Sequence, residues 1–367
     1  MKKILAFGKK NAVVLIAALC ALITSLIVPP DKEYLGYFDL KTLTCLFCVL
    51  GVVCALRNIR FFYTLAKAVI RKFKNAKASI LALVYITFIG SMLIANDMAL
   101  LTFLPLGYFV LHTTGKEKYM AFTFIMQNVA ANLGGMLTPF GNPQNLYLYS
   151  KFNIPDLEFV GIMFIPFIIA IALITLCCLV FVKAEPLVIE EKAASLPVWR
   201  VIAYLILFTL SILIVFGVVS YYVGLIIITA SLLILDRKAL GQVDYGLLLT
   251  FVFFFIFSGN MARIDAVREF FSGLLEINTL VVSAISCQFI SNVPTAVLLS
   301  QFTDNYKELL LGVNIGGVGT LISSLASLIT FREYSKQDPG HTARYILKFS
   351  AFNFAFLGIL ILICLFI

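Results

Sequence analysis

Charged side chains are scarce in this chain of 367 residues, because Asp, Glu, Lys and Arg together make up only 13% of it. A soluble domain carries about 25% charged residues, so the composition excludes an ordinary soluble protein. Histidine occurs only twice, as His112 and His341, and both fall in predicted loops without a partner pattern for metal binding or nucleophilic catalysis. Membrane enzymes usually gather acidic pairs or histidines at a membrane face. We therefore expect no enzyme activity.

The eight cysteines all lie within apolar stretches. Cys45 and Cys48 have a spacing known from metal and redox sites, but no histidine lies near them. We interpret the cysteines as small core hydrophobes and expect no disulfide framework. No cofactor is predicted, and no metal beyond a possible Na⁺.

Long apolar runs dominate the chain, which is 61% hydrophobic. Runs of this length predict membrane-spanning helices rather than a barrel, and hence an all-α polytopic membrane protein whose surroundings are a lipid bilayer. The net charge of +9 is explained by loop charges that set orientation, so no nucleic-acid partner is expected. Nine crossings are predicted, at about 13–29, 41–57, 119–150, 160–182, 199–219, 221–235, 245–260, 309–331 and 343–367.

Two motifs occur twice, in the same order. The segment 131–138 (ANLGGMLT) reappears as 313–320 (VNIGGVGT), and the upstream segment 94–97 (IAND) is matched by 290–293 (ISNV). Paired polar breaks in two halves indicate a binding site at a repeat interface. We predict two inverted repeats, 1–182 and 221–367, joined by a linker and connecting helix at 183–220. The first contains a re-entrant hairpin at about 79–111 and a broken helix at 119–150, and the second a hairpin at about 280–303 and a broken helix at 309–331.

Loop charges predict the orientation. Lys and Arg crowd the segments that lie on the same side as the N-terminus, which places that end in the cytoplasm and the C-terminus outside a plasma (inner) membrane. Segment 61–75 mixes apolar and basic residues and reads as a helix along the interface, with 264–276 as its counterpart.

Each hairpin has a polar break near its middle. Asp97 is the only acidic residue predicted inside any span or hairpin, and it is either a cation or proton site or the N-cap of a helix starting at Met98. Asn292 with Ser291 is its counterpart, and the alternative there is a capped tip without a binding role.

The two broken helices supply further candidate ligands. Two prolines and a glycine interrupt segment 138–145, so freed carbonyls and amides can coordinate Na⁺, while the helix restarting near Pro143 presents N–H groups to an anion. Segment 319–327 keeps a glycine and hydroxyls. Without a binding role, segment 138–145 would be a structural kink, and the small residues of segment 319–327 would serve close helix packing. Substrate binding is predicted at Asn96, Asn292, Ser291, Asn145, Thr138 and Thr320, and coupling-ion binding at Asp97, Asn96, Gly141, Asn142, Asn145, Ser291, Asn292, Ser323 and Ser327.

Segments 96–101, 141–145 and 291–294 resemble the ion transporter superfamily, which includes citrate-transporter-like proteins, divalent anion/sodium symporters, arsenite permeases and some sodium/proton antiporters. The resemblance implies elevator-type alternating access and a homodimer. In the symporter branch each tip reads Ser-Asn-Thr. Here both threonines are absent, and Asp97 is closer to the branches that move arsenite or exchange cations for protons.

These observations predict a secondary active transporter of a small inorganic or organic anion, carboxylate-like, coupled to Na⁺ or H⁺. The alternative within the superfamily is a sodium/proton antiporter or an arsenite-type efflux permease. A channel is a further alternative, distinguished by currents far above carrier turnover.

Overall fold

The computed structural model describes residues 12–187 and 196–366, and within them the chain is helical throughout. One isolated β-bridge joins Asn75 and Pro186, and these described ranges contain no strand. The expected all-α class is therefore confirmed. The first half contains α2 (Ala12–Ile27), α3 (Leu40–Asn58), α4 (Phe61–Ile70), α5 (Ala76–Ile94), α6 (Asn96–Thr113), α7 (Met120–Gly134), α8 (Pro143–Lys151) and α9 (Asp156–Phe181). The rest contains α10 (Val198–Val215), α11 (Tyr221–Leu235), α12 (Arg237–Gly241), α13 (Tyr245–Ala262), α14 (Asp265–Ile290), α15 (Asn292–Leu299), α16 (Tyr306–Ile315), α17 (Leu325–Gln337) and α18 (Thr342–Cys364).

Seven of the described helices are long and apolar enough to cross a membrane, which makes the protein a multi-pass membrane protein. Predicted crossings at 13–29 and 221–235 form the shorter apolar helices α2 and α11. The predicted crossings 119–150 and 309–331 are each divided in two, as α7 with α8 and α16 with α17, so neither is a continuous span. The first break coincides with the prolines and glycine of segment 138–145, and the second lies at the glycines near residue 319.

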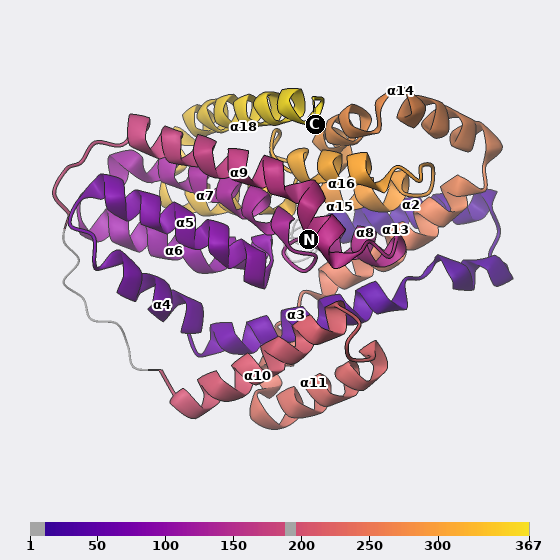
Figure 1. Cartoon of the computed structure of the whole chain (residues 1–367), viewed down its shortest axis with the longest axis horizontal. Helices are drawn as coiled ribbons and strands as arrows, with labels where there is room; N and C mark the ends of the chain where they lie inside the picture. The colour runs from indigo at the N-terminus through magenta and orange to yellow at the C-terminus, as the bar shows by residue number, and fades with distance from the viewer. Residues whose placement is uncertain (1–11, 188–195, 367) are drawn as a thin grey trace, which may run out of the picture.

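The helices gather in three groups (Figure 1). Helices α5, α6, α7 and α9 lie on the left of the view, and α2, α13 and α14 lie on the right. Helices α10 and α11 form a pair at the lower edge that packs on α3. Between the left and right groups, α8, α15 and α16 meet at the centre, where the ends of helices from both halves of the chain converge.

Helix α14 is two helices joined at a kink. Asn278 has non-helical backbone angles (φ −168°, ψ 102°), and its side-chain oxygen accepts a hydrogen bond of 2.8 Å from the amide of Val281. Asn75 does the same at the start of α5, accepting from the amide of Ala78 at 2.8 Å. The part of α14 before the kink occupies the predicted segment 264–276, and α4 occupies the first part of 61–75. An Asn cap thus opens the second helix of each matched pair.

Candidate functional site

The two hairpin tips have the same backbone geometry. Each turns through one residue at positive φ, Ala95 (φ 65°, ψ 150°) and Ser291 (φ 73°, ψ 156°). A side chain at positive φ is strained, so the surroundings must hold both turns in place. The asparagine that follows each turn starts a new helix, Asn96 for α6 and Asn292 for α15.

Each tip is hydrogen-bonded to the break in the neighbouring helix pair. The amide of Asn96 donates to the carbonyl of Gly141 at 3.2 Å, and the amide of Asn292 donates to the carbonyl of Ser323 at 2.9 Å. Both asparagine side chains then accept from the next backbone amide, each at 2.9 Å. The helix starts of α6 and α8 are therefore adjacent in one half, and those of α15 and α17 in the other.

The two threonines predicted to bind substrate each donate a hydrogen bond to a carbonyl close to one of the tips. The Thr138 hydroxyl donates to the carbonyl of Met92 at 2.7 Å, and the Thr320 hydroxyl donates to the carbonyl of Gln288 at 3.0 Å. The Thr138 hydroxyl thus binds the last turn of α5, and the Thr320 hydroxyl binds the last turn of α14. In this structure they fix the breaks against the tips.

A cluster of buried amides joins the two halves. The Asn314 side-chain oxygen accepts from Asn142 at 3.2 Å and from Gln144 at 3.4 Å. Its nitrogen donates to the side-chain oxygen of Asn145 at 2.6 Å. All four side chains are buried, with at most 1% of their surface exposed. Asn314 of α16 therefore connects the start of α8 directly to the second half of the chain.

Asn145 also closes the break in the first half. Its side-chain nitrogen donates to the carbonyls of Gly135, Met136 and Thr138, each at 3.2 Å. The matching position in the second half is Ser327, whose hydroxyl pairs with that of Ser324 at 2.9 Å and accepts from the amide nitrogen of Asn128. A single amide therefore organises the first break, and a chain of hydroxyls organises the second.

The two tips approach one another around Gly317. The Asn96 side chain donates to the side-chain oxygen of Asn132 at 3.3 Å. A Cβ atom built on Gly317 would lie 3.2 Å from the side-chain nitrogen of Asn292 and 3.4 Å from that same Asn132 oxygen. The asparagines of the two tips are thus brought to one place, although they are far apart in the sequence. A side chain at this position would crowd the two asparagines.

Some oxygens of the cluster have no donor. The side-chain oxygens of Asn142 and Gln144 are buried and without a hydrogen-bond partner among residues 12–187 and 196–366. Within these described ranges, the side chains that form the cluster include no Lys or Arg. Buried polar groups are nearly always satisfied, and amide and carbonyl oxygens are ligands for Na⁺. These atoms could hold a monovalent cation.

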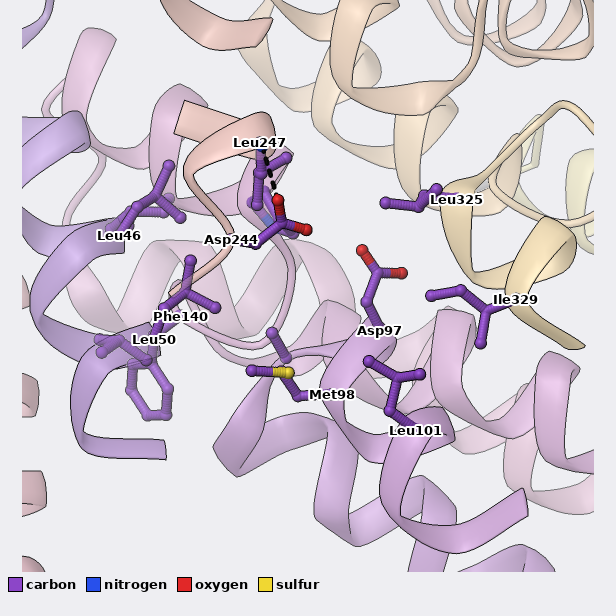
Figure 2. A pocket seen from close by; sticks show the side chains of 14 residues that line it. Leu46, Leu50, Asp97, Met98, Leu101, Phe140, Asp244, Leu247, Leu325 and Ile329 are labelled. Carbon is purple, nitrogen blue, oxygen red and sulfur yellow. Dashed lines mark hydrogen bonds between the residues drawn. The ribbon is translucent and has the colours of Figure 1, made fainter. Parts of the chain in front are cut away.

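Asp97 lies beside this cluster, in the first turn of α6. Ala95 holds the N-cap position, and the Oδ1 atom of Asp97 is buried with no hydrogen-bond partner in the described part of the chain. Asp97 therefore does not cap the helix, which begins at Asn96 rather than Met98. Its carboxylate points into a cavity of about 50 Å³ (Figure 2), which has room for a few water molecules.

Several polar side chains of this region were missed by the sequence reasoning. Asn132 and Asn314 stand in the repeated motif, yet no role was predicted for them. A second buried group joins Asn128, Thr330 and Asn353, with Asn128 donating to the Asn353 oxygen at 3.4 Å. Polar residues inside apolar spans were the signal that could have identified them all.

Two helix pairs whose tips meet at a buried amide cluster, within a multi-pass helical protein, are typical of a membrane transporter. The family model described as "Citrate transporter" matches residues 4–306. The chain belongs to the citrate transporter family.

Two relatives have similar sequences. A protein of Methanocaldococcus jannaschii that is named only as an uncharacterised transporter is 35% identical over 302 residues, which are 82% of each chain. The inner membrane protein YbiR of Escherichia coli is 28% identical over 281 residues, 74% of each chain. The expected relationship to citrate-transporter-like proteins is confirmed.

Proposed function

We propose that this chain is a secondary active transporter of a small carboxylate-like anion, coupled to Na⁺ or H⁺. The observation that carries the proposal is the convergence of four helix starts, those of α6, α8, α15 and α17, on one amide cluster shared by both halves. The name of the family supports the choice of a carboxylate substrate.

The anion would be held by helix N-termini. The N-cap residues of α6, α8 and α15 (Ala95, Asn142 and Ser291) make no side-chain cap. The first two backbone amides of α6 and α15 already donate to a carbonyl of the neighbouring break and to the Asn side chain. The helix dipole, rather than free N–H groups, would therefore favour negative charge there. Because the cluster lacks Lys and Arg among the described residues, these helix starts and a bound cation supply the positive potential.

The coupling cation would bind next to the anion. The unpartnered oxygens of Asn142 and Gln144 and the carbonyl of Gly141 are oxygen ligands in the first half. Ser323 and Ser327 occupy the matching positions in the second half. A cation at either place offsets the charge of a bound anion.

Alternating access would follow from inverted repeats with re-entrant hairpins. The matched tips, breaks and Asn caps support the repeat, and in Figure 1 the α5–α6 pair and the α14–α15 pair reach the centre from different sides. Elevator-type movement, a homodimer, and a cytoplasmic N-terminus with an external C-terminus in the plasma (inner) membrane complete the proposal.

The test is an uptake panel with the purified protein in liposomes. Citrate, succinate, sulfate, arsenite and Na⁺ are offered with and without Na⁺ and pH gradients. We expect a carboxylate to accumulate only when a gradient is present. Accumulation of arsenite or sulfate alone, or flux with the turnover of a channel, contradicts the proposal.

A sodium/proton antiporter is the second candidate, and the unpartnered carboxylate of Asp97 favours it. In the same liposomes it predicts Na⁺ movement driven by a pH gradient with no anion present. That result without any anion uptake would replace the first candidate by the second.

A further inference from the structure

The short helix α4 connects two helices that can each cross a membrane. It has 10 residues and lies between α3 and α5 in the chain and, on the left of Figure 1, between α3 and α6 in space. A helix of that length extends over about 15 Å, about half of the ~30 Å hydrocarbon core. Irregular backbone exposed to lipid does not lie within that core. The end of α3, α4 and the start of α5 therefore lie at one face of the membrane.

Basic side chains gather at both ends of α4 without acidic ones. From residue 40 to residue 96 the sequence contains no Asp or Glu. Five basic residues of this stretch are exposed, and together they are called the α4 basic surface: Arg57, Arg60, Arg71, Lys72 and Lys74. Among residues 12–187 and 196–366, no acidic side chain forms an ion pair with any of the five. The surface therefore keeps its full positive charge within the described chain.

Exposed apolar side chains stand among these charges. Leu65 is 55% exposed, and Phe73, which stands between two lysines, is 36% exposed. The opposite side of α4 is buried against the protein, and there Lys67 lies with its ammonium 4.9 Å from the ring centre of Phe109 in α6. A helix that buries one side in the protein and presents basic and apolar residues on the other is typical of the headgroup region of a bilayer.

Two acidic residues beside this surface already have partners. Asp236 accepts a hydrogen bond of 2.9 Å from the side-chain nitrogen of Asn58 and one of 3.2 Å from the amide of Ala239. The Glu185 carboxylate is held by two lysines and a tyrosine near the start of α7. The bond to Asn58 also brings two exposed basic residues of α12 beside the end of α3, namely Arg237 and Lys238.

We propose that the α4 basic surface binds the headgroups of anionic phospholipids, with Leu65 and Phe73 inserted at the boundary of the acyl chains. Phosphate oxygens accept charge-assisted hydrogen bonds from Lys and Arg, and Arg can bind them with two parallel bonds. A cluster of basic residues next to a membrane-spanning helix is attracted to an anionic leaflet, and each residue adds to the affinity. The proposal does not depend on which substrate the protein carries.

The apolar side chains favour a lipid over a soluble anion. Free phosphate can satisfy the same Lys and Arg side chains, but it gains nothing from Leu65 and Phe73. A phospholipid engages both, because its phosphate meets the charges while its acyl chains cover the apolar side chains. Mixed surfaces of this kind therefore select the headgroup together with the chains attached to it.

Lipid bound here would fix the base of the first hairpin. Helix α4 leads into α5, and α5 ends at the turn through Ala95. Headgroups held on α4 would keep the start of α5 at the membrane face. This consequence rests on the proposed transport function, in which the hairpin changes its position relative to such a fixed point.

Quenching of a single tryptophan by brominated lipid measures which lipid occupies the surface. The chain has one tryptophan, so Trp199→Phe combined with Phe73→Trp leaves one reporter, within the α4 basic surface. The control reporter is Leu157→Trp in the same background, because Leu157 is 88% exposed and stands between Asp156 and Glu158. Each protein is placed in bilayers of brominated phosphatidylcholine, a rising fraction of which is replaced by unbrominated phosphatidylglycerol or unbrominated phosphatidylcholine. Thermal unfolding of each variant verifies folding.

We expect phosphatidylglycerol to relieve quenching at position 73 at least about threefold more effectively than phosphatidylcholine, and to show no such preference at position 157. Neutralising three charges of the surface should remove the preference, in the combined variant Arg71→Gln, Lys72→Gln and Lys74→Gln. Salt at 1 M should also remove it, because the Debye length falls to about 3 Å. The matched control removes three exposed charges from a segment of mixed sign and should keep the preference: Arg332→Gln, Lys336→Gln and Arg344→Gln.

Three results would overturn the proposal. They are an equal preference at both reporters, a preference that survives the triple neutralisation or 1 M salt, and loss of the preference on adding inorganic phosphate at constant ionic strength, which would indicate a site for free phosphate. The two reporters and the salt series keep the test valid if the triple variant fails to fold. A lipid preference in a protein that takes up no substrate would reject the proposed transport function and retain the lipid surface.

Discussion

The tip at Ala95 and the tip at Ser291 share their backbone and differ in their side chains. Both turn at positive φ, and both hydrogen-bond a helix break through the amide of the following asparagine. After that asparagine, the first half has Asp97 and the second half has Val293. The repeated backbone is therefore compatible with a charged tip in one half and an apolar tip in the other.

The breaks differ in the same way. The first is built on Gly141, Asn142 and Asn145, and the second on Ser323, Ser324 and Ser327 at matching positions. Amides with two donors and an acceptor oxygen can bridge to the other half, as Asn142 does toward Asn314. Among the hydroxyls of the second break, Ser323 bonds to the nearby carbonyls of Gly317 and Thr320, whereas Ser327 accepts from Asn128 of the first half. The two breaks thus offer different side chains for the proposed ion binding, amides in the first half and hydroxyls in the second.

The largest expected effect is loss of uptake on removing the amides of the site. Asn96→Ala, Asn145→Ala and Asn292→Ala should each reduce uptake at least 100-fold, equivalent to about 2.7 kcal/mol, because their amides position both tips and the first break. Initial uptake rates in liposomes measure this.

The matched control is Asn260→Ala. Asn260 is equally buried, but it donates to Thr24 and Ser25, at the contact between α13 and α2. That variant should keep most of its uptake. If two of the three site variants also transport normally, the tips are structural turns only.

A second prediction concerns stability. It compares Asn314 with Asn132, which stands at the matching position of the repeated motif. Asn314→Ala leaves three polar side chains without their partner, at about 1–3 kcal/mol for each buried unsatisfied group. Asn132→Ala removes a single side-chain acceptor. Thermal unfolding in detergent should show a loss of about 3 kcal/mol or more for the first and about 1 kcal/mol for the second. Equal losses would mean that Asn314 does not bridge the halves.

Exchanging residues between the two breaks gives a smaller effect. A Cβ on Gly141 would lie 2.7 Å from the Thr138 hydroxyl and would overlap the carbonyl of Gly135. Gly141→Ser should therefore lower uptake about tenfold, equivalent to about 1.4 kcal/mol. Ser323→Gly, the reverse exchange, should lower it less than threefold. If both exchanges are tolerated, the two breaks are interchangeable.

The smallest expected effect is on the unfolding temperature, from a substitution at Glu185 in the segment that follows α9. Glu185 accepts hydrogen bonds from Lys116, Lys118 and Tyr119, and these contacts lower its pKa to about 2. A lowered folded-state pKa stabilises the protein above the unfolded value of about 4.3 and less as pH falls toward 2. Glu185→Gln should lower the unfolding temperature slightly at neutral pH, by less than Asn132→Ala. The difference from wild type should shrink below about pH 4; a constant difference would show that charge plays no role.

Local features of the fold could be predicted from the sequence. Two prolines and a glycine between α7 and α8 predict the break and the restart at Pro143, and polar residues within apolar runs mark the helix starts at Asn96 and Asn292. The break at 319–327, which has no proline, was found through the repeat. Local chemistry and internal repetition were enough for these elements.

Pairings between distant residues could not be predicted. The contact of Asn142 with Asn314 depends on how helices from both halves pack. The hydrogen bonds that Thr138 and Thr320 donate to the carbonyls of Met92 and Gln288 also join segments far apart in the sequence. A polar residue in an apolar span marks a site, while its partner is fixed by tertiary packing.

The central claim is that ion coupling resides in the charged tip of the first half. Uptake by the wild type and by Asp97→Asn, measured across a grid of Na⁺ concentration and pH, tests it most directly. Asn keeps the size of the side chain and removes its charge. The account predicts that Asp97→Asn still binds substrate but loses its dependence on the pH or Na⁺ gradient. An unchanged dependence on both would contradict it and would move the coupling site away from Asp97.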